Sequence, residues 1–267
     1  MEKYNNNDIK NSALLCIENL SIQINDRARK FLAVDNFSLQ INPNQILAII
    51  GESGSGKTLT ALAVLGLLPQ QAKIIFGKIK FKNKQIALNN NYLLKQIRGK
   101  LIATIFQEPQ SALNPVIRIG KQIRDVITEH LKLTKFEAKN KTIKILQEVG
   151  LPEPDIIYDS YPHQLSGGMA QRAMIAMALS CNPELIIADE PTTALDVTTQ
   201  KKILNLLSDL QKKYQYSLLL ISHDLNVVSI LADYVIVLKN GKTIEQGNTK
   251  SLLSQPKNPY TKLLLNS

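Results

Sequence analysis

Alternating apolar and polar side chains characterise the N-terminal third of the chain. Residues 14–24 and 31–41 show this alternation, and residues 74–86 continue it with a break at Gly77. Because successive side chains of a strand point to opposite faces, the pattern predicts an antiparallel sheet with one buried face. The charged residues 26–30 are expected to form the turn between the first two strands.

Shorter runs that are apolar throughout predict a second set of strands, since parallel strands have both faces covered. Segments with apolar side chains at helical spacing lie between these runs, which indicates alternating α/β structure. We expect buried strands at residues 46–50, 101–106, 185–188, 217–221 and 234–238, and helices at residues 59–68, 169–179, 198–210, 225–232 and 252–265. Asn240 and Gly241 are typical of a hairpin turn.

A helical stretch separates the two strand-rich halves. From Gly120 to Gly150 the apolar residues recur at helical intervals, and Pro152 and Pro154 end the pattern. Two apolar stripes are expected to face the core, one with Ile123, Val126, Ile127 and Leu131, and one with Phe136, Ile143, Leu146 and Val149.

A glycine-rich loop of the form G-x-x-x-x-G-K-[ST] lies between a predicted strand and a predicted helix. It consists of Gly51, Glu52, Ser53, Gly54, Ser55, Gly56, Lys57 and Thr58. Such glycines let backbone N–H groups converge on anionic oxygens, and the helix N-terminus adds partial positive charge. Lys57 can then reach the β- and γ-phosphates, and the Thr58 hydroxyl can bind Mg²⁺. The loop predicts binding of a nucleoside triphosphate.

Two adjacent carboxylates, Asp189 and Glu190, follow the buried strand at residues 185–188. Ligands of open α/β sheets bind at the carboxyl ends of the strands. Neighbouring side chains of a strand point in different directions, so one can hold Mg²⁺ through water while the other polarises the attacking water. We assign Asp189 to the metal and Glu190 to the general base.

Three further segments could take part in the chemistry. His223 follows a buried strand and could hydrogen-bond the γ-phosphate, although a single histidine is more often structural. Gln107, also just past a strand, could contact Mg²⁺ or water. A second helix N-terminus that could bind an anion follows Ser166, Gly167 and Gly168. It suggests that these residues bind a nucleotide held by another copy of the chain. The alternative for this segment is an ordinary helix cap.

The composition is that of a globular protein, and the charge leaves the partner open. The 267 residues are 44% hydrophobic and 20% charged, with a net charge of +10. This charge permits binding to nucleic acid or to an anionic membrane surface, but the lysines are scattered along the chain. No apolar run approaches the ~18 residues of a membrane-spanning helix, and the N-terminus is polar. We therefore expect a cytoplasmic protein unless a membrane partner holds it.

Taken together, these motifs resemble the nucleotide-binding subunit of ABC transporters. The similarity covers about residues 13–262, and the order and spacing of the motifs agree with the family. Residues 51–58 resemble the Walker A loop, Gln107 the Q-loop, residues 165–171 the signature, residues 185–190 Walker B, residues 194–196 the D-loop, and His223 the switch histidine.

The resemblance implies an α/β fold with a P-loop NTPase core. That core has a mixed sheet with helices on both faces, an antiparallel β subdomain and a helical signature subdomain. The whole chain, residues 1–267, would be one nucleotide-binding domain. Residues 1–106 and 185–267 would form the core with its β subdomain, and residues 107–184 the helical subdomain. Phe31 could stack on the adenine of ATP, or it could be a core residue.

The resemblance also implies a mechanism and partners. Two ATPase subunits, identical or different, would sandwich two ATP molecules with Mg²⁺ between the phosphate loop of one and the signature of the other. Ser166, Gly167 and Gly168 would contact the γ-phosphate held by the partner, and Glu190 would activate water. Closure of this dimer would drive two integral membrane permease subunits at the inner membrane. An extracytoplasmic solute-binding protein would supply the cargo to these permease subunits.

Finer features resemble the importers of oligopeptides, dipeptides and nickel. They lie in residues 106–115, in Met169, in residues 187–196 and in the tail at residues 258–261. This similarity favours peptide uptake, while the short segment after the tail also fits nickel importers. A chromosome-maintenance or translation ATPase of the same family is the alternative from another class. Chromosome-maintenance ATPases contain long coiled coils, and translation ATPases carry two nucleotide domains in one chain. Neither fits 267 residues with one motif set, so we expect no nucleic-acid partner.

Overall fold

The computed structural model describes residues 13–25, 29–88, 90–193 and 195–265. The chain divides into two compact units, one made of Met1–Leu94 with Ser217–Ser267 and the other of Lys95–Tyr216. The second unit contains the predicted helical subdomain, residues 107–184, but also two strands. The boundaries given above for the core and the helical subdomain therefore stay predictions.

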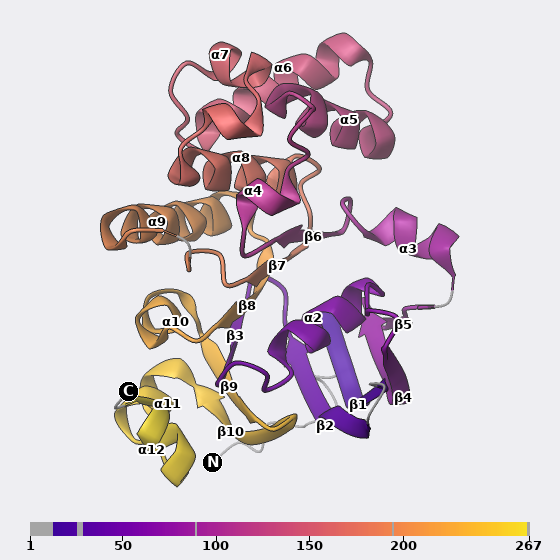
Figure 1. Cartoon of the computed structure of the whole chain (residues 1–267), viewed down its shortest axis with the longest axis vertical. Helices are drawn as coiled ribbons and strands as arrows, with labels where there is room; N and C mark the ends of the chain where they lie inside the picture. The colour runs from indigo at the N-terminus through magenta and orange to yellow at the C-terminus, as the bar shows by residue number, and fades with distance from the viewer. Residues whose placement is uncertain (1–12, 26–28, 89, 194, 266–267) are drawn as a thin grey trace, which may run out of the picture. The chain divides into compact units, whose positions relative to one another are not determined.

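The first unit contains an antiparallel sheet with the strand order β2-β1-β4-β5 (Figure 1). The register pairs Leu15 of β1 with Ile41 of β2 on one side and with Phe81 of β4 on the other. All three side chains are buried, as the alternating pattern predicts. The strands are β1 (Leu15–Asn25), β2 (Lys30–Ile41), β4 (Ala72–Phe81) and β5 (Lys84–Gln85). Strand β4 continues through Gly77, but its pairing with β1 is irregular there and Gly77 has a φ of 100°. The predicted turn falls partly on residues 26–28, outside the described residues.

The same unit contains the strand that leads into the phosphate loop. Strand β3 (Ile46–Ile50) pairs in parallel with β8 (Ser217–Ser222) and with β9 (Tyr234–Lys239), and all five of its residues are buried. Strand β10 (Lys242–Asn248) pairs with β9 as an antiparallel hairpin. The predicted turn is confirmed, because Asn240 and Gly241 connect the two strands with φ angles of 48° and 76°.

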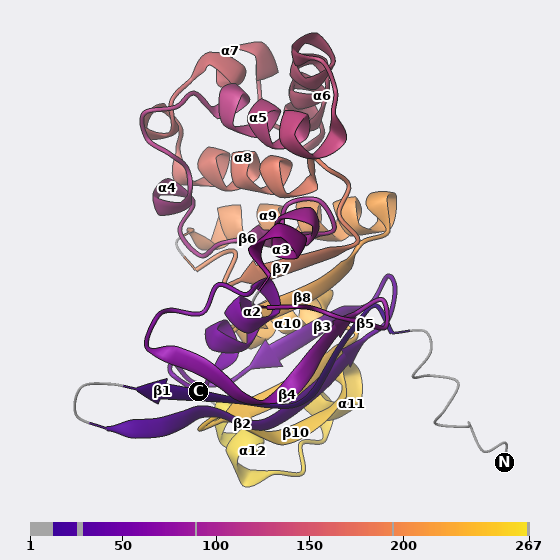
Figure 2. The ribbon, with the colours of Figure 1, turned by 90° about the vertical axis from the view of Figure 1, so that its right-hand side faces the viewer.

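The C-terminal segment, predicted as one helix over residues 252–265, consists of two helices in the structure. These are α11 (Thr249–Ser254) and α12 (Pro259–Leu265), and both lie beside β10 in Figures 1 and 2. Pro256 and Pro259 explain the interruption, because a proline has no N–H to donate within a helix. Pro259 stands at the first position of α12, where this N–H is not needed.

The second unit contains the parallel pair β6 (Ile102–Ile105) and β7 (Leu185–Asp189), with Thr104 opposite Ile187. Its main helices are α5 (Ile119–Leu131), α6 (Lys135–Glu148), α8 (Gly167–Leu179) and α9 (Val197–Tyr214). These elements confirm the predicted strands and helices of this region. No helix in the described ranges of either unit is long and apolar enough to cross a membrane.

One predicted core stripe is wrong in detail. Phe136 is 73% exposed, whereas the buried face of α6 consists of Ala138, Thr142, Ile145 and Leu146. The reason is the capping box formed by Thr134 and Glu137, which starts the helix at Lys135 and turns Phe136 outward.

Three short helices had no clear sequence pattern. They are α3 (Asn91–Ile97), α4 (Pro109–Ala112) and α7 (Pro154–Asp159). A helix of one or two turns contains too few residues to show a helical period. Helix α6 ends at Glu148, a little before the predicted stop at residues 151–154, and Pro154 begins α7.

Candidate functional site

The phosphate loop has the strand–loop–helix geometry that the sequence predicts. Helix α2 (Lys57–Leu65) starts directly after Gly56, whose φ of 102° is in the left-handed region. A Cβ atom on Gly51 would lie 2.1 Å from the carbonyl oxygen of Leu238, and one on Gly56 would lie 2.6 Å from that of Ala33. Both glycines are therefore required by close backbone contacts as well as by conformation.

The amine of Lys57 lies inside the loop. Its Nζ atom donates to the carbonyl oxygens of Gly51 at 2.7 Å and Glu52 at 2.8 Å, and to Oγ of Ser55 at 3.4 Å. The side chain is only 5% exposed, while Thr58, the next residue, is exposed. A buried ammonium group held by neutral oxygens is a suitable partner for an anionic phosphate, because charge-assisted hydrogen bonds are stronger than neutral ones.

His223 leaves the sheet beside the phosphate loop. Ile50, the last residue of β3, pairs with Ser222, the last residue of β8. Gly51 and His223 therefore follow neighbouring parallel strands at the same edge of the sheet. Asp224 caps α10 (Leu225–Leu231) by accepting from the backbone N–H of Asn226 at 2.8 Å. The side chain of His223, between β8 and this cap, is exposed.

The second unit brings together Gln107 and Glu190. Glu190 follows β7 directly, and its Oε2 atom accepts hydrogen bonds from Nε2 of Gln107 and from Oγ1 of Thr193, each at 3.0 Å. The contact between Gln107 and the carboxylate joins residues that are 83 positions apart. Asp189, the last residue of β7, is half-buried. These contacts fix one oxygen of the predicted general base.

The predicted signature residues begin α8. The Oγ atom of Ser166 accepts from the backbone N–H of Met169 at 3.3 Å, and Gly167 and Gly168 form the first turn of the helix. Ser166 thus acts as a helix cap, which does not preclude a second role at an exposed helix N-terminus. A Cβ atom on Gly168 would lie 2.8 Å from Cγ2 of Thr199, so this glycine also allows α8 to approach α9.

Sequence reasoning did not predict the contacts that Thr193 and Gln171 make next to the predicted base, although Gln171 is the last residue of the predicted signature. Thr193 donates to Glu190, as described above, and Gln171 donates from Nε2 to the carbonyl oxygen of Pro191 at 2.6 Å. Gln171 is 1% exposed and belongs to the buried face of α8 together with Ala170 and Met174. A glutamine within an otherwise apolar helix face was the signal, because buried polar groups are hydrogen-bonded.

Replacing Gln171 with methionine is expected to reduce the free energy of unfolding by about 1–3 kcal/mol, because the carbonyl of Pro191 loses its donor in a buried place. We also expect a lower kcat for ATP hydrolysis, since Pro191 directly follows Glu190. Gln147→Met, on the exposed side of α6, is the matched control and should change stability by less than about 0.5 kcal/mol. Denaturant unfolding measures the stability of both variants, and equal stability of the two would contradict the prediction.

Phe31, considered as an adenine-stacking residue or a core residue, is 40% exposed. The guanidinium group of Arg29 lies 5.3 Å from the centre of its ring. This exposure does not support the core interpretation, and stacking on adenine stays a prediction. Of the D-loop, residue 194 lies outside the described residues, while Asp196 caps α9 by accepting from the backbone N–H of Thr199 at 2.9 Å.

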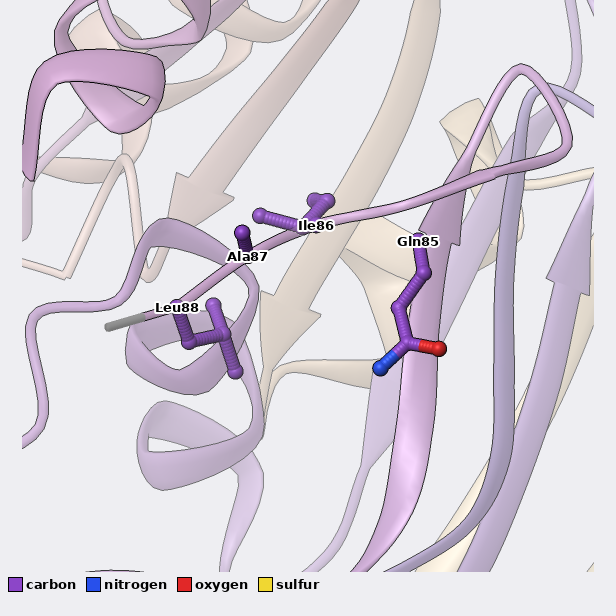
Figure 3. A pocket seen from close by; sticks show the side chains of 4 residues that line it. All are labelled: Gln85, Ile86, Ala87 and Leu88. Carbon is purple, nitrogen blue, oxygen red and sulfur yellow. The ribbon is translucent and has the colours of Figure 1, made fainter. Parts of the chain in front are cut away.

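Two surface hollows of the first unit contain none of the predicted site residues. One, of ≈ 430 Å³, is lined by residues 85–88, with Ile86 and Ala87 on one side of the chain and Gln85 and Leu88 on the other (Figure 3). The second, of ≈ 680 Å³, lies among β1, β2 and β9. The candidate site is therefore defined by its loops and strand ends rather than by these hollows.

The phosphate loop, the strand-end carboxylates and the α/β architecture define a P-loop nucleotide-hydrolysing protein. Comparison with known proteins gives the family: the sequence profile of ABC transporters matches residues 34–193. The chain belongs to the ABC transporter family and is an ATPase of that family.

Curated relatives cover almost the whole chain. The dipeptide transport ATP-binding protein of Haemophilus influenzae is 44% identical over 96% of this chain and 77% of its own length. The oligopeptide transport ATP-binding protein AppD of Bacillus subtilis is 46% identical over 96% of this chain and 78% of its own length. Among solved structures, a dimeric ATP-binding cassette in a post-hydrolysis state with ADP and Pi is 27% identical. It has a TM-score of 0.78 and covers 88% of this chain and 98% of its own. The predicted fold class is thus confirmed.

Proposed function

We propose that this chain is the ATP-hydrolysing subunit of an importer that takes up dipeptides or oligopeptides. The observation that carries the proposal is the identity of 41–46% to several proteins named as dipeptide or oligopeptide transport ATP-binding proteins, over 95–97% of this chain. The predicted residues of the phosphate loop and of the strand end are all present in this matched region.

In this proposal the phosphate loop binds the β- and γ-phosphates of ATP through its backbone N–H groups and Lys57. Glu190 takes the proton of the attacking water, and Gln107 and Thr193 hold its carboxylate in place. His223 hydrogen-bonds the γ-phosphate. Ser166, Gly167 and Gly168 contact the γ-phosphate of the nucleotide bound by a second ATPase subunit, which forms a head-to-tail dimer with this chain.

Mg²⁺ would be held by the hydroxyl of Thr58, the amide oxygen of Gln107 and the carboxylate of Asp189. These are hard oxygen donors, which Mg²⁺ prefers. In the structure Nε2 of Gln107 contacts Glu190, so the amide oxygen points away from that carboxylate. The ion, when bound, neutralises charge that develops on the transferred phosphoryl group.

The partners follow from the same role. Two integral membrane permease subunits would bind this chain at the cytoplasmic face of the inner membrane and hold it there as a peripheral protein. An extracytoplasmic solute-binding protein would deliver the cargo to them. The second ATPase subunit would be either a copy of this chain or a different ATPase, and we propose no nucleic-acid partner.

The test is uptake of labelled di- to hexapeptides and of labelled Ni²⁺, in parallel, by cells that carry the wild-type chain or Glu190→Gln. We expect peptide uptake to be lost and Ni²⁺ uptake to be unchanged, because ATP hydrolysis drives the transport of the cargo. Loss of Ni²⁺ uptake alone would assign the chain to a nickel importer instead. If neither changed while the purified protein hydrolysed ATP, the importer role would be wrong.

A further inference from the structure

Helix α12 reaches the phosphate loop through one side chain, Tyr260. The backbone N–H of Glu52 donates to the hydroxyl of Tyr260 at 3.3 Å, although 208 positions separate the two residues. Tyr260 is only 7% exposed, so water cannot easily replace its hydroxyl as the acceptor. The contact links the C-terminal helix to the second residue of the loop.

The backbone of Glu52 also connects this contact to Lys57. While the N–H of Glu52 binds Tyr260, its carbonyl oxygen accepts from Nζ of Lys57 at 2.8 Å. A second contact to the loop comes from Gly241, whose backbone N–H donates to the carbonyl oxygen of Ser55 at 3.0 Å. The β9–β10 hairpin and α12 thus both make hydrogen bonds to the loop within one unit.

Tyr260 is itself held in place by residues outside the loop. Glu245 of β10 accepts from the backbone N–H groups of Lys257 at 2.8 Å and Asn258 at 3.1 Å, and Asn258 Oδ1 accepts from that of Tyr260 at 2.9 Å. The amine of Lys239 lies 4.1 Å from the centre of the tyrosine ring, a favourable cation–π distance. Figures 1 and 2 show α12 beside β10.

The hydroxyl group of Tyr260 lies in a buried environment beside Glu52. Burial, assisted by the nearby carboxylate of Glu52, raises the pKa of Tyr260 above its ordinary value. The oxygen of this hydroxyl accepts from the backbone N–H of Glu52, because a phenolic hydroxyl can act as acceptor as well as donor.

We propose that Tyr260 is a positioning residue for ATP binding, and that residues 257–261 form a latch that holds the phosphate loop in its binding conformation. This inference rests on the proposed role of the loop and of Lys57 in binding ATP. By thermodynamic reciprocity, a latch that favours ATP binding must itself be stabilised when ATP binds. Simple packing of the tail would affect the stability of the protein but not its affinity for ATP.

The main test is Tyr260→Phe, which removes the hydroxyl and keeps the ring over Lys239. We expect the Kd and KM for ATP to rise by about 3- to 10-fold, the effect of one hydrogen bond, with kcat within about twofold of wild type. The matched control is Tyr216→Phe. This variant removes a fully buried hydroxyl that donates to the carbonyl oxygen of Leu207 in the other unit. It should lower the melting temperature and leave the Kd for ATP unchanged.

A second variant acts on the latch without touching the loop. Glu245→Ala removes the acceptor of the Lys257 and Asn258 N–H groups, and it should raise the Kd for ATP in the same direction as Tyr260→Phe. Hydrogen exchange gives an independent measurement. In the wild type, saturating ATP should slow exchange at Glu52 and in residues 257–265, whereas in Tyr260→Phe the tail should no longer respond.

The outcomes separate the latch from the site on which it rests. If Tyr260→Phe binds ATP like the wild type while Lys57→Met binds it weakly, the latch is wrong and the phosphate site stands. An equal loss of affinity in Tyr216→Phe would likewise overturn the latch, because that residue does not contact the loop. If Lys57→Met retains wild-type affinity, the proposed phosphate site is wrong, and the latch with it.

Discussion

Glu190→Gln is expected to lower kcat for ATP hydrolysis by about 10²–10⁴-fold while ATP binding is largely retained. Glu190 directly follows β7, and its Oε2 atom accepts from Gln107 and Thr193, each at 3.0 Å. An amide oxygen can accept the same two hydrogen bonds, so the local structure should persist. An amide cannot take a proton from water, so the chemical step should fail. Steady-state phosphate release and equilibrium ATP binding measure the two effects separately.

The matched control for this change is Glu129→Gln. Glu129 lies in α5 of the same unit with an exposed side chain, and no predicted site residue belongs to that helix. This variant should hydrolyse ATP at the wild-type rate. The assignment of Glu190 as general base would be wrong if its variant lost less than about 10-fold in kcat, or if it no longer bound ATP.

The phosphate loop could be predicted from the sequence because all of its determinants are local. The apolar run of β3, the glycines and the helix that starts at Lys57 are consecutive in the chain, and the structure reproduces them in that order. The hairpin at Asn240 and Gly241 was predictable for the same reason, because two adjacent residues specify the turn.

The contacts that hold the proposed general base and the phosphate loop could not be predicted in the same way. Gln107 and Glu190 are 83 positions apart, and Tyr260 and Glu52 are 208 positions apart. Such pairs depend on how the strands and helices pack in three dimensions, which periodicity does not encode. Gln107 was expected to contact Mg²⁺ or water, and its direct contact with the carboxylate of Glu190 adds a role that only the fold reveals.

Local signals also compete, and the structure shows which one prevails. Phe136 matches the apolar period of its helix but lies in its first turn, where the capping box of Thr134 and Glu137 sets the orientation and leaves the ring exposed. The C-terminal apolar pattern suggested one helix, whereas Pro256 and Pro259 divide it. That division orients α12 independently of α11 and brings Tyr260 to the loop.

Lys57→Met is expected to weaken ATP binding by about 10- to 100-fold. A hydrogen bond to a charged group contributes about 1.5–3 kcal/mol, and each 1.4 kcal/mol corresponds to a tenfold change in affinity. Methionine keeps most of the apolar stem of the lysine, so the variant removes mainly the ammonium group that the carbonyls of Gly51 and Glu52 hold inside the loop.

The identity of the lost contact can be tested with shorter nucleotides. If Lys57 binds the β- and γ-phosphates, its variant should lose affinity for ATP and ADP but bind AMP nearly as well as the wild type, since AMP has only an α-phosphate. Lys73→Met, on an exposed position of β4 in the same unit, is the matched control for the loss of one positive charge and should bind all three nucleotides normally. Isothermal titration measures each affinity. An equal loss for AMP and ATP would mean that the substitution collapses the loop, because only a direct phosphate contact makes the loss depend on the number of phosphates.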